Sequence, residues 1–162
     1  MTNGARTGVT TYATPADREV VITRIVDAPR RVVFDAWTNP KHVSQWLLGP
    51  EGWTMPACEI DLRPGGSWRY VWRKSDDAEM AMGGSYREVV PPERLVSTEK
   101  WGPEWPETVN TLVLTESGGR TTITLTVRYP NKEARDAALK TEMKEGMDQG
   151  FARLDTLLRT LV

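Results

Sequence analysis

The residues of this chain that are best suited to hold another molecule are aromatic. Seven Trp and four Tyr occur in 162 residues that contain only two Phe. Trp68, Tyr70 and Trp72 occupy alternate positions, with Val71 as the one apolar residue on the opposite, otherwise polar face, so a β-strand places the three rings on one face. We predict that they line a surface for a flat or apolar ligand, because packed cores usually favour Leu, Ile and Val. The alternative is that the rings fill an ordinary core.

Further aromatic and methionine side chains lie on segments that could face this strand. The other candidate binding residues are Trp46, Trp53, Met82, Tyr86, Trp101, Met143, Met147 and Phe151. Methionine is flexible and polarisable, so it suits pockets that accept several shapes, although it also fills gaps in cores. Met143 and Met147 lie one helical turn apart and are the better pocket candidates among the methionines.

His42 is the only histidine, so no other side chain is expected to titrate near neutral pH. It falls early in a predicted short helix. No Ser, Cys or carboxylate lies at a sequence spacing from His42 that would bring the two side chains together as a nucleophile–base pair. We therefore expect a solvent-exposed helix residue and no catalytic residue in this chain.

Glu59 and Asp61 are two residues apart and share one face of a predicted strand. Paired carboxylates can perform acid–base chemistry. Apolar residues occupy the opposite face, however, which favours a polar outer surface here. Arg69 and Arg73 would face the same way on the next strand and could pair with these carboxylates.

Composition excludes several classes of function. Lys and Arg total 21 against 22 Asp and Glu, and this balance argues against nucleic acid as a partner. No apolar run approaches the roughly 20 residues of a membrane span. Cys58 is the only cysteine and has no basic neighbour, so we expect neither a disulfide nor a reactive thiolate. With no signal-peptide pattern and no cluster of metal ligands, we expect a cytoplasmic protein without metal or cofactor.

The N-terminal third predicts one strand and two short helices. Residues 1–16 lack periodicity and are interpreted as a flexible leader or edge strand, ahead of a single domain over 17–162. Residues 19–27 are β-branched and predict a strand. A short helix then opens at Pro29, and a second covers residues 41–47.

The remainder predicts six strands and one long helix. The strands are expected at 54–62, 67–74, 79–90, 95–101, 107–116 and 120–129. Asn131 is expected to cap a single helix that continues to about residue 160, with apolar residues at spacings of three and four. An antiparallel sheet must bury its apolar face against such a helix. The chain is therefore predicted to be α+β, with a curved sheet wrapped around the C-terminal helix and a space between them.

This order of elements resembles the helix-grip (START/Bet v 1-like) fold. Within that fold the chain is similar to the activator of heat-shock-protein-90 ATPase homologue family. The matching segments are residues 24–29, 33–37, 46–53, 61–66, 86–96 and 146–147. The Arg-Pro-Gly-Gly turn at 63–66 and the Pro-Pro-Glu-Arg-Leu-Val run at 91–96 are specific in combination. Relatives often carry Gly-Trp where this chain has Gly146-Met147, which implies a roomier pocket.

The resemblance is more specific about the fold than about the function, because proteins with this fold include carriers, enzymes and a co-chaperone domain. We expect non-catalytic binding of a small hydrophobic or aromatic molecule between the sheet and the C-terminal helix. One alternative is a co-chaperone-type activator of a heat-shock ATPase. Another is a polyketide cyclase or aromatase, in which Tyr70, Tyr86 or an arginine would polarise a carbonyl. A protein partner or a homodimer also stays open.

Overall fold

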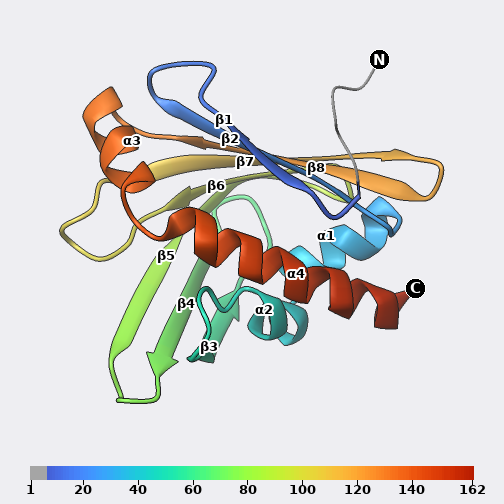
Figure 1. The fold of residues 1–162 in the computed structure, drawn as a ribbon, viewed down its shortest axis with the longest axis horizontal. Helices are drawn as coiled ribbons and strands as arrows, with labels where there is room; N and C mark the ends of the chain where they lie inside the picture. Colours follow the sequence, from blue (N-terminus) through green and yellow to red (C-terminus); the bar gives the residue numbers. More distant parts are fainter. Residues whose placement is uncertain (1–6) are drawn as a thin grey trace.

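The computed structural model describes residues 7–162, which form one curved antiparallel sheet and four helices (Figure 1). The strands are β1 (Thr10–Ala13), β2 (Glu19–Val26), β3 (Trp53–Ile60), β4 (Ser67–Lys74), β5 (Glu79–Val90), β6 (Arg94–Glu99), β7 (Thr108–Ser117) and β8 (Arg120–Arg128). The helices are α1 (Arg30–Thr38), α2 (Pro40–Trp46), α3 (Lys132–Leu139) and α4 (Met143–Leu161). The strand order is β1-β2-β8-β7-β6-β5-β4-β3, and α4 crosses the concave side. The predicted α+β helix-grip architecture is confirmed.

The long strand β5 produces the sharpest bend of the sheet. Its first half pairs with β4 and its second half pairs with β6, so it belongs to both halves of the sheet. Gly84 lies at the change of partner, where a Cβ atom would be only 1.9 Å from the carbonyl oxygen of Thr98. A residue without a side chain is therefore required for this close strand approach. Before Gly83, which bridges to Lys100, β5 has no strand partner on the β6 side.

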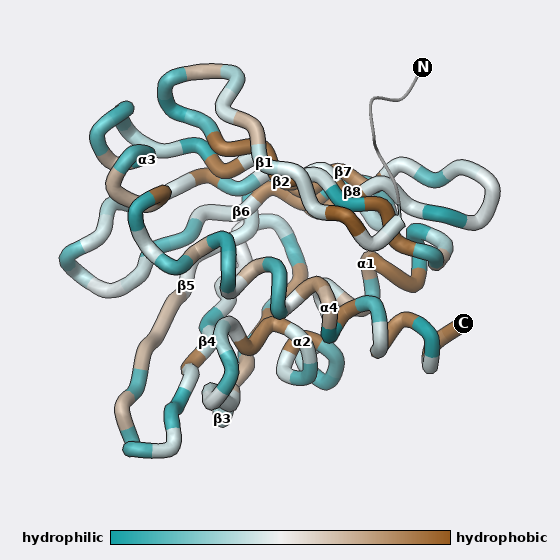
Figure 2. Tube along the Cα trace, in the orientation of Figure 1, coloured by the Kyte–Doolittle hydropathy of each residue, from teal (hydrophilic) through white to brown (hydrophobic). Residues whose placement is uncertain are grey.

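The main core lies between α1, α2, α4 and the middle of the sheet. Along β2 every second residue is buried, including Val20, Ile22 and Val26, so an alternating sequence supplies one apolar face. Leu154 and Leu158 of α4 are buried and belong to the same core cluster as these β2 residues. Figure 2 shows hydrophobic colouring along β2, β7 and β8, and hydrophilic colouring at the tip of the β4–β5 hairpin. The apolar packing is therefore concentrated at one end of α4.

The prediction of one uninterrupted helix after Asn131 is wrong. Asn131 does cap a helix, because its side chain accepts a hydrogen bond from the Ala134 amide at 2.8 Å. The helix ends at Leu139, however, and a new one begins at Met143. The Thr141 hydroxyl donates to the Ala138 carbonyl at 2.6 Å and accepts from the Met143 amide at 3.2 Å. These local bonds compete with the helical pattern, while the apolar periodicity continues across the break.

The N-terminal segment holds a strand. β1 pairs with β2 at the edge of the sheet, inside the segment interpreted as a leader or edge strand. Residues 1–6 of that segment lie outside the described residues.

The second half of α4 is fixed to the sheet by a buried ion pair. The Arg24 guanidinium on β2 donates a hydrogen bond to the Asp155 carboxylate. It also donates to the Thr10 hydroxyl, at a distance of 2.6 Å. It lies 5.4 Å from the ring centre of Phe151 on the same helix. The residue before Phe151 is Gly150, which lets the helix approach the backbone of Trp46, since a Cβ atom there would lie 3.3 Å from the Trp46 carbonyl oxygen.

Candidate functional site

A row of aromatic rings forms the concave face of β4 and continues onto the segment after β6. Trp68 and Tyr70 have ring centres 4.7 Å apart, and Tyr70 meets Trp72 edge-on at 5.8 Å. Trp72 then stacks on Trp101, with centres 5.5 Å apart and planes inclined by 5°. Offset and edge-on contacts of this kind add stability beyond the area that they bury. The structure thus places the three β4 rings on one face, as their alternation predicts, and joins Trp101 to them.

Protein atoms fix the orientation of these rings. The indole N–H groups donate to backbone carbonyls in three cases: Trp46 to Ala36 at 2.8 Å, Trp68 to Thr98 at 3.1 Å and Trp72 to Leu47 at 2.8 Å. Trp101 donates to the Glu99 carboxylate at 3.3 Å. Because each of these four indole donors is satisfied by a protein acceptor, none of them is free to bind a further acceptor.

Trp46 and Phe151 belong to the core. They are 1% and 0% exposed, and their rings stack with centres 6.2 Å apart. Trp37 closes the group from α1, 4.8 Å from Trp46. Both predicted residues take part in the packing between α1, α2 and α4. The same core cluster includes the β4 rings of Trp68, Tyr70 and Trp72, which are 6%, 7% and 4% exposed.

The other end of the concave face is incompletely covered. On the inward face of β7, Leu112 and Leu114 are almost completely buried, Asn110 is part-exposed, and Thr108 at the start of the strand is buried again. The part-exposed residues at this end are Cys58, Ile60, Ser97, Glu99, Trp101, Asn110, Met143 and Met147. We call this region the open end. Three predicted residues, Trp101, Met143 and Met147, lie there, and predicted Trp53 is likewise part-exposed on β3.

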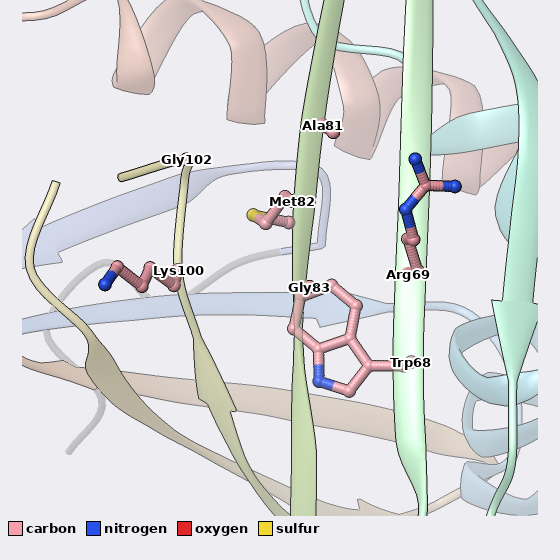
Figure 3. Close-up of a pocket in the computed structure, with 7 residues that line it drawn as sticks. All are labelled: Trp68, Arg69, Ala81, Met82, Gly83, Lys100 and Gly102. Atoms are coloured by element: carbon pink, nitrogen blue, oxygen red, sulfur yellow. The ribbon is translucent and has the colours of Figure 1, made fainter. Parts of the chain in front are cut away.

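A shallow depression of about 210 Å³ adjoins the aromatic row where β5 lacks a partner on the β6 side (Figure 3). Its lining residues are Trp68, Arg69, Ala81, Met82, Gly83, Lys100 and Gly102. Trp68 and Met82 are buried residues of the predicted set, whereas Arg69, Ala81 and Lys100 are exposed and were not predicted. The adjacent glycines Gly83 and Gly84 were the available signal, because glycine inside a strand often marks a bend or close approach.

Glu99 is a polar residue of the open end that sequence reasoning missed. Its side chain lies among protein atoms, and burial raises the pKa of the carboxyl above its usual value. Hydrogen bonds from the Asn110 and Trp101 side chains act in the opposite direction. None of the ion pairs among residues 7–162 includes Glu99. The Glu99 carboxyl therefore has no counter-ion within 4.0 Å in the described part of the chain.

Tyrosine hydroxyls lie near this carboxyl. Burial, followed by the charges of Tyr86, Cys58 and Glu99, raises the pKa of Tyr70 well above its usual value. Burial and then Glu99 raise the pKa of Tyr129 to about 12. The Tyr129 hydroxyl meets the sulfur of Met143 at 3.8 Å. The concave face therefore carries neutral hydroxyls and one carboxyl among its aromatic rings.

The prediction of an exposed His42 is wrong. Its side chain is only 14% exposed, and Nε2 lies 3.2 Å from an Asp35 carboxylate oxygen. Nδ1 is buried and has no hydrogen-bond partner. The reason is the tight turn at Asn39, which caps α2 and folds the start of α2 back onto α1.

The predicted polar outer face is confirmed. Glu59 and Arg69 lie 3.9 Å apart across β3 and β4, and Arg73 pairs with Glu79 of β5 at 2.6 Å. Asp61 instead binds Arg63 in the following turn, at 2.9 Å. Such exposed pairs are worth little individually, which suits a solvated surface better than a reaction centre.

Cys58 has the character expected from the sequence. Burial, followed by the charge of Glu59, raises the pKa of its thiol to about 11. A thiol with so high a pKa is a poor nucleophile near neutral pH.

Two further features of residues 7–162 bear on function. No helix in this range combines the length and the apolar composition that a membrane crossing requires. Within the same range, no three His, Cys, Asp or Glu side chains gather closely enough to bind a metal ion.

Comparisons with other proteins agree on one family and one fold. The family model described as "Activator of Hsp90 ATPase homolog 1-like protein" matches residues 27–159. A crystal structure of a protein from Rhodobacter sphaeroides is 27% identical, with a TM-score of 0.89 over 93% of this chain and 98% of that one. Protein Ms6760 from Mycobacterium smegmatis is 23% identical, with a TM-score of 0.82 over 93% and 97%.

A third solved structure carries the family name. It is an AHSA1-like protein from Aeromonas hydrophila, 16% identical, with a TM-score of 0.66 over 85% of this chain and 93% of that one. None of the curated proteins matches the chain.

Proposed function

Since this chain belongs to the family of activator of Hsp90 ATPase homolog 1-like proteins, we propose that it binds a small apolar or aromatic molecule without transforming it. The ligand lies on the concave face, between the aromatic row and the first turns of α4. The observation that carries this proposal is the aromatic row of Trp68, Tyr70, Trp72 and Trp101 leading to the open end.

Burial of apolar surface supplies the affinity in this proposal, because transfer of apolar area from water is favourable and non-directional. The stacked pair of Trp72 and Trp101 offers a flat surface for a planar ring. Met143 and Met147 lie across from the sheet on α4 and can adapt to ligands of different shape. Tyr70 and Glu99 supply a few polar groups, as small-molecule sites usually do.

The indole fluorescence of the protein tests this proposal. We expect apolar aromatic compounds to quench or shift the emission and to raise the melting temperature. A ligand at 100 times its dissociation constant should stabilise the fold by about 2.7 kcal/mol. A broad panel that changes neither quantity overturns the proposal.

Two tryptophan variants locate the site. Trp101→Leu removes the ring that stacks on Trp72 and should weaken binding at least several-fold. Trp105→Leu is the matched control, because Trp105 is an exposed residue of the same β6–β7 loop. Equal effects of the two variants would place the ligand elsewhere.

The family name favours a second candidate, stimulation of a heat-shock ATPase. Addition of the purified protein to Hsp90 and measurement of ATP hydrolysis test it directly. A rate increase that Trp101→Leu leaves unchanged would assign the activity to a surface other than the aromatic row.

A further inference from the structure

The carboxyl of Glu99 lacks a counter-ion on an otherwise apolar face. No ion pair among the described residues includes Glu99. Its carboxylate accepts a hydrogen bond from the neutral indole of Trp101 at 3.3 Å, and the neutral side chain of Asn110 is its second donor. A buried charge that is unpaired is costly, so a charged carboxyl here calls for a partner of opposite sign. The residue is part-exposed at the open end, which leaves room for such a partner.

The carboxyl also has unused capacity to accept hydrogen bonds. A carboxylate offers about four lone-pair positions. Trp101 and Asn110 account for two donors. The remaining capacity is not used by Tyr129, whose hydroxyl is directed to the Met143 sulfur.

The aromatic surroundings of Glu99 favour a cation over an anion. The faces of Trp and Tyr rings carry negative charge density and attract ammonium groups, with Trp the strongest. Trp101 donates to Glu99 and stacks on Trp72, and Tyr70 lies edge-on to Trp72. An anionic ligand would meet ring faces and a carboxyl of the same sign, whereas a cation is attracted by both.

We propose that the ligand of this chain carries a cationic nitrogen, as a protonated amine or quaternary ammonium beside an apolar or aromatic group, with Glu99 as its counter-ion. This inference rests on the proposed binding function and specifies the chemical class of the ligand. The apolar part lies on the aromatic row, and the cationic nitrogen lies against the Glu99 carboxyl, beside the Trp101 indole that donates to that carboxyl.

Three compounds of matched shape test the inference. Benzyltrimethylammonium is cationic, neopentylbenzene is its neutral isostere, and phenylmethanesulfonate is an anionic counterpart. Intrinsic tryptophan fluorescence and competition between the compounds give the affinities. We expect the ammonium to bind at least tenfold more tightly than the neutral isostere, and the sulfonate to bind most weakly.

The variant Glu99→Gln removes the charge and keeps the shape of the side chain. It should reduce affinity for benzyltrimethylammonium at least tenfold and change affinity for neopentylbenzene by less than threefold. Glu59→Gln is the matched control, because it removes the same charge from the exposed outer face. It should leave all three affinities unchanged. The comparison of isosteres on the unmodified protein needs no variant, so it stands even if Glu99→Gln folds poorly.

The pH dependence gives a further readout, because benzyltrimethylammonium does not titrate. Burial raises the pKa of Glu99, so binding of the ammonium should strengthen as the pH rises through that pKa and the carboxyl loses its proton. The other titratable groups near it also have raised pKa values, about 11 for Cys58, about 12 for Tyr129 and well above the usual value for Tyr70. Glu99→Gln should therefore abolish the dependence.

The outcomes separate this inference from the function on which it rests. If the neutral isostere binds as tightly as the ammonium and Glu99→Gln has no effect, the inference is overturned and the proposed function stands. If none of the three compounds binds, and the wider aromatic panel also fails, the proposed function falls and the inference falls with it.

Discussion

Substitution of Gly84 by alanine should damage the bend that joins the two halves of the sheet. A Cβ atom at this position would lie 1.9 Å from the Thr98 carbonyl oxygen and 2.6 Å from its carbonyl carbon. Non-bonded heavy atoms settle at roughly 3.5–4.0 Å, so the added carbon cannot be accommodated in place. Because the atoms that it meets belong to the backbone, β5 and β6 must move apart.

The expected loss of folding stability in Gly84→Ala follows from the hydrogen bonds made by Thr98. Its carbonyl accepts from the Trp68 indole at 3.1 Å, and its hydroxyl accepts from the Ser85 amide at 3.0 Å. The Ser85 and Thr98 hydroxyls also lie 3.3 Å apart. A hydrogen bond contributes about 0.5–1.5 kcal/mol, so loss of all three destabilises the fold by roughly 1.5–4.5 kcal/mol. At roughly 2–4 °C per kcal/mol for a chain of this size, the melting temperature should fall by roughly 3–18 °C.

Urea denaturation followed by tryptophan emission measures this change. The emission of the folded protein should also shift, because Trp68 loses its acceptor. Gly146→Ala is the control: its Cβ would lie at an ordinary 3.5 Å from Pro50. Replacement of glycine within a helix should stabilise that variant by about 0.5–1 kcal/mol. If Gly84→Ala unfolds within about 0.5 kcal/mol of the unmodified protein, the close approach of β5 to Thr98 is not required and the reasoning fails.

Three further predictions concern the concave face. Met147→Trp should keep or raise the melting temperature and weaken ligand binding several-fold, because the new ring occupies space at the open end. Destabilisation by more than about 1 kcal/mol with ligand binding intact would show that Met147 is an ordinary core residue. Glu99→Gln should raise the melting temperature at pH 7. Burial raises the pKa of this carboxyl in the folded chain, so the stability of the unmodified protein falls as the pH rises above the pKa that Glu99 has in the unfolded chain. The difference in melting temperature between the two proteins should vanish near pH 4, where the carboxyl is protonated in both states. Cys58, with a pKa of about 11, should resist iodoacetamide at pH 8 in the folded protein and react after unfolding; fast alkylation of the folded chain would contradict its burial.

The sequence predicts the architecture well because each element carries its own local signal. Alternation places Trp68, Tyr70 and Trp72 on one face, and turn residues separate the strands of the sheet. The break between α3 and α4 escapes this reasoning, because the hydrogen bonds of Thr141 are local while the apolar stripe passes through unchanged. Hydrophobic periodicity reports which face is buried and not whether the backbone is continuous.

The candidate site was less predictable because it depends on contacts between distant segments. Trp46 and Trp101 are equally plausible ligand contacts in the sequence but lie in different environments in the structure. Trp46 is enclosed by helices, whereas Trp101 stacks on Trp72 at the open end. Glu99 has no distinguishing sequence pattern, since its environment is made by Asn110 and Trp101 after folding. His42 became buried for the same reason, through packing of α2 against α1.

The uneven attachment of α4 gives the molecule a mechanical asymmetry. From Gly150 onward the helix is held by the Arg24–Asp155 ion pair and by buried Phe151. Toward Met143 its side chains are part-exposed or exposed, and Tyr12 of β1 holds this half through hydrogen bonds to the Asp148 carboxylate at 2.8 Å and to the Lys144 carbonyl at 3.3 Å. The first half of α4 is therefore attached by polar contacts at the surface, whereas the second half is attached by apolar packing and an ion pair. Segments with few buried apolar contacts open at lower free energy, so under the proposed function we expect the first half to move before the second when ligands of different thickness are accommodated.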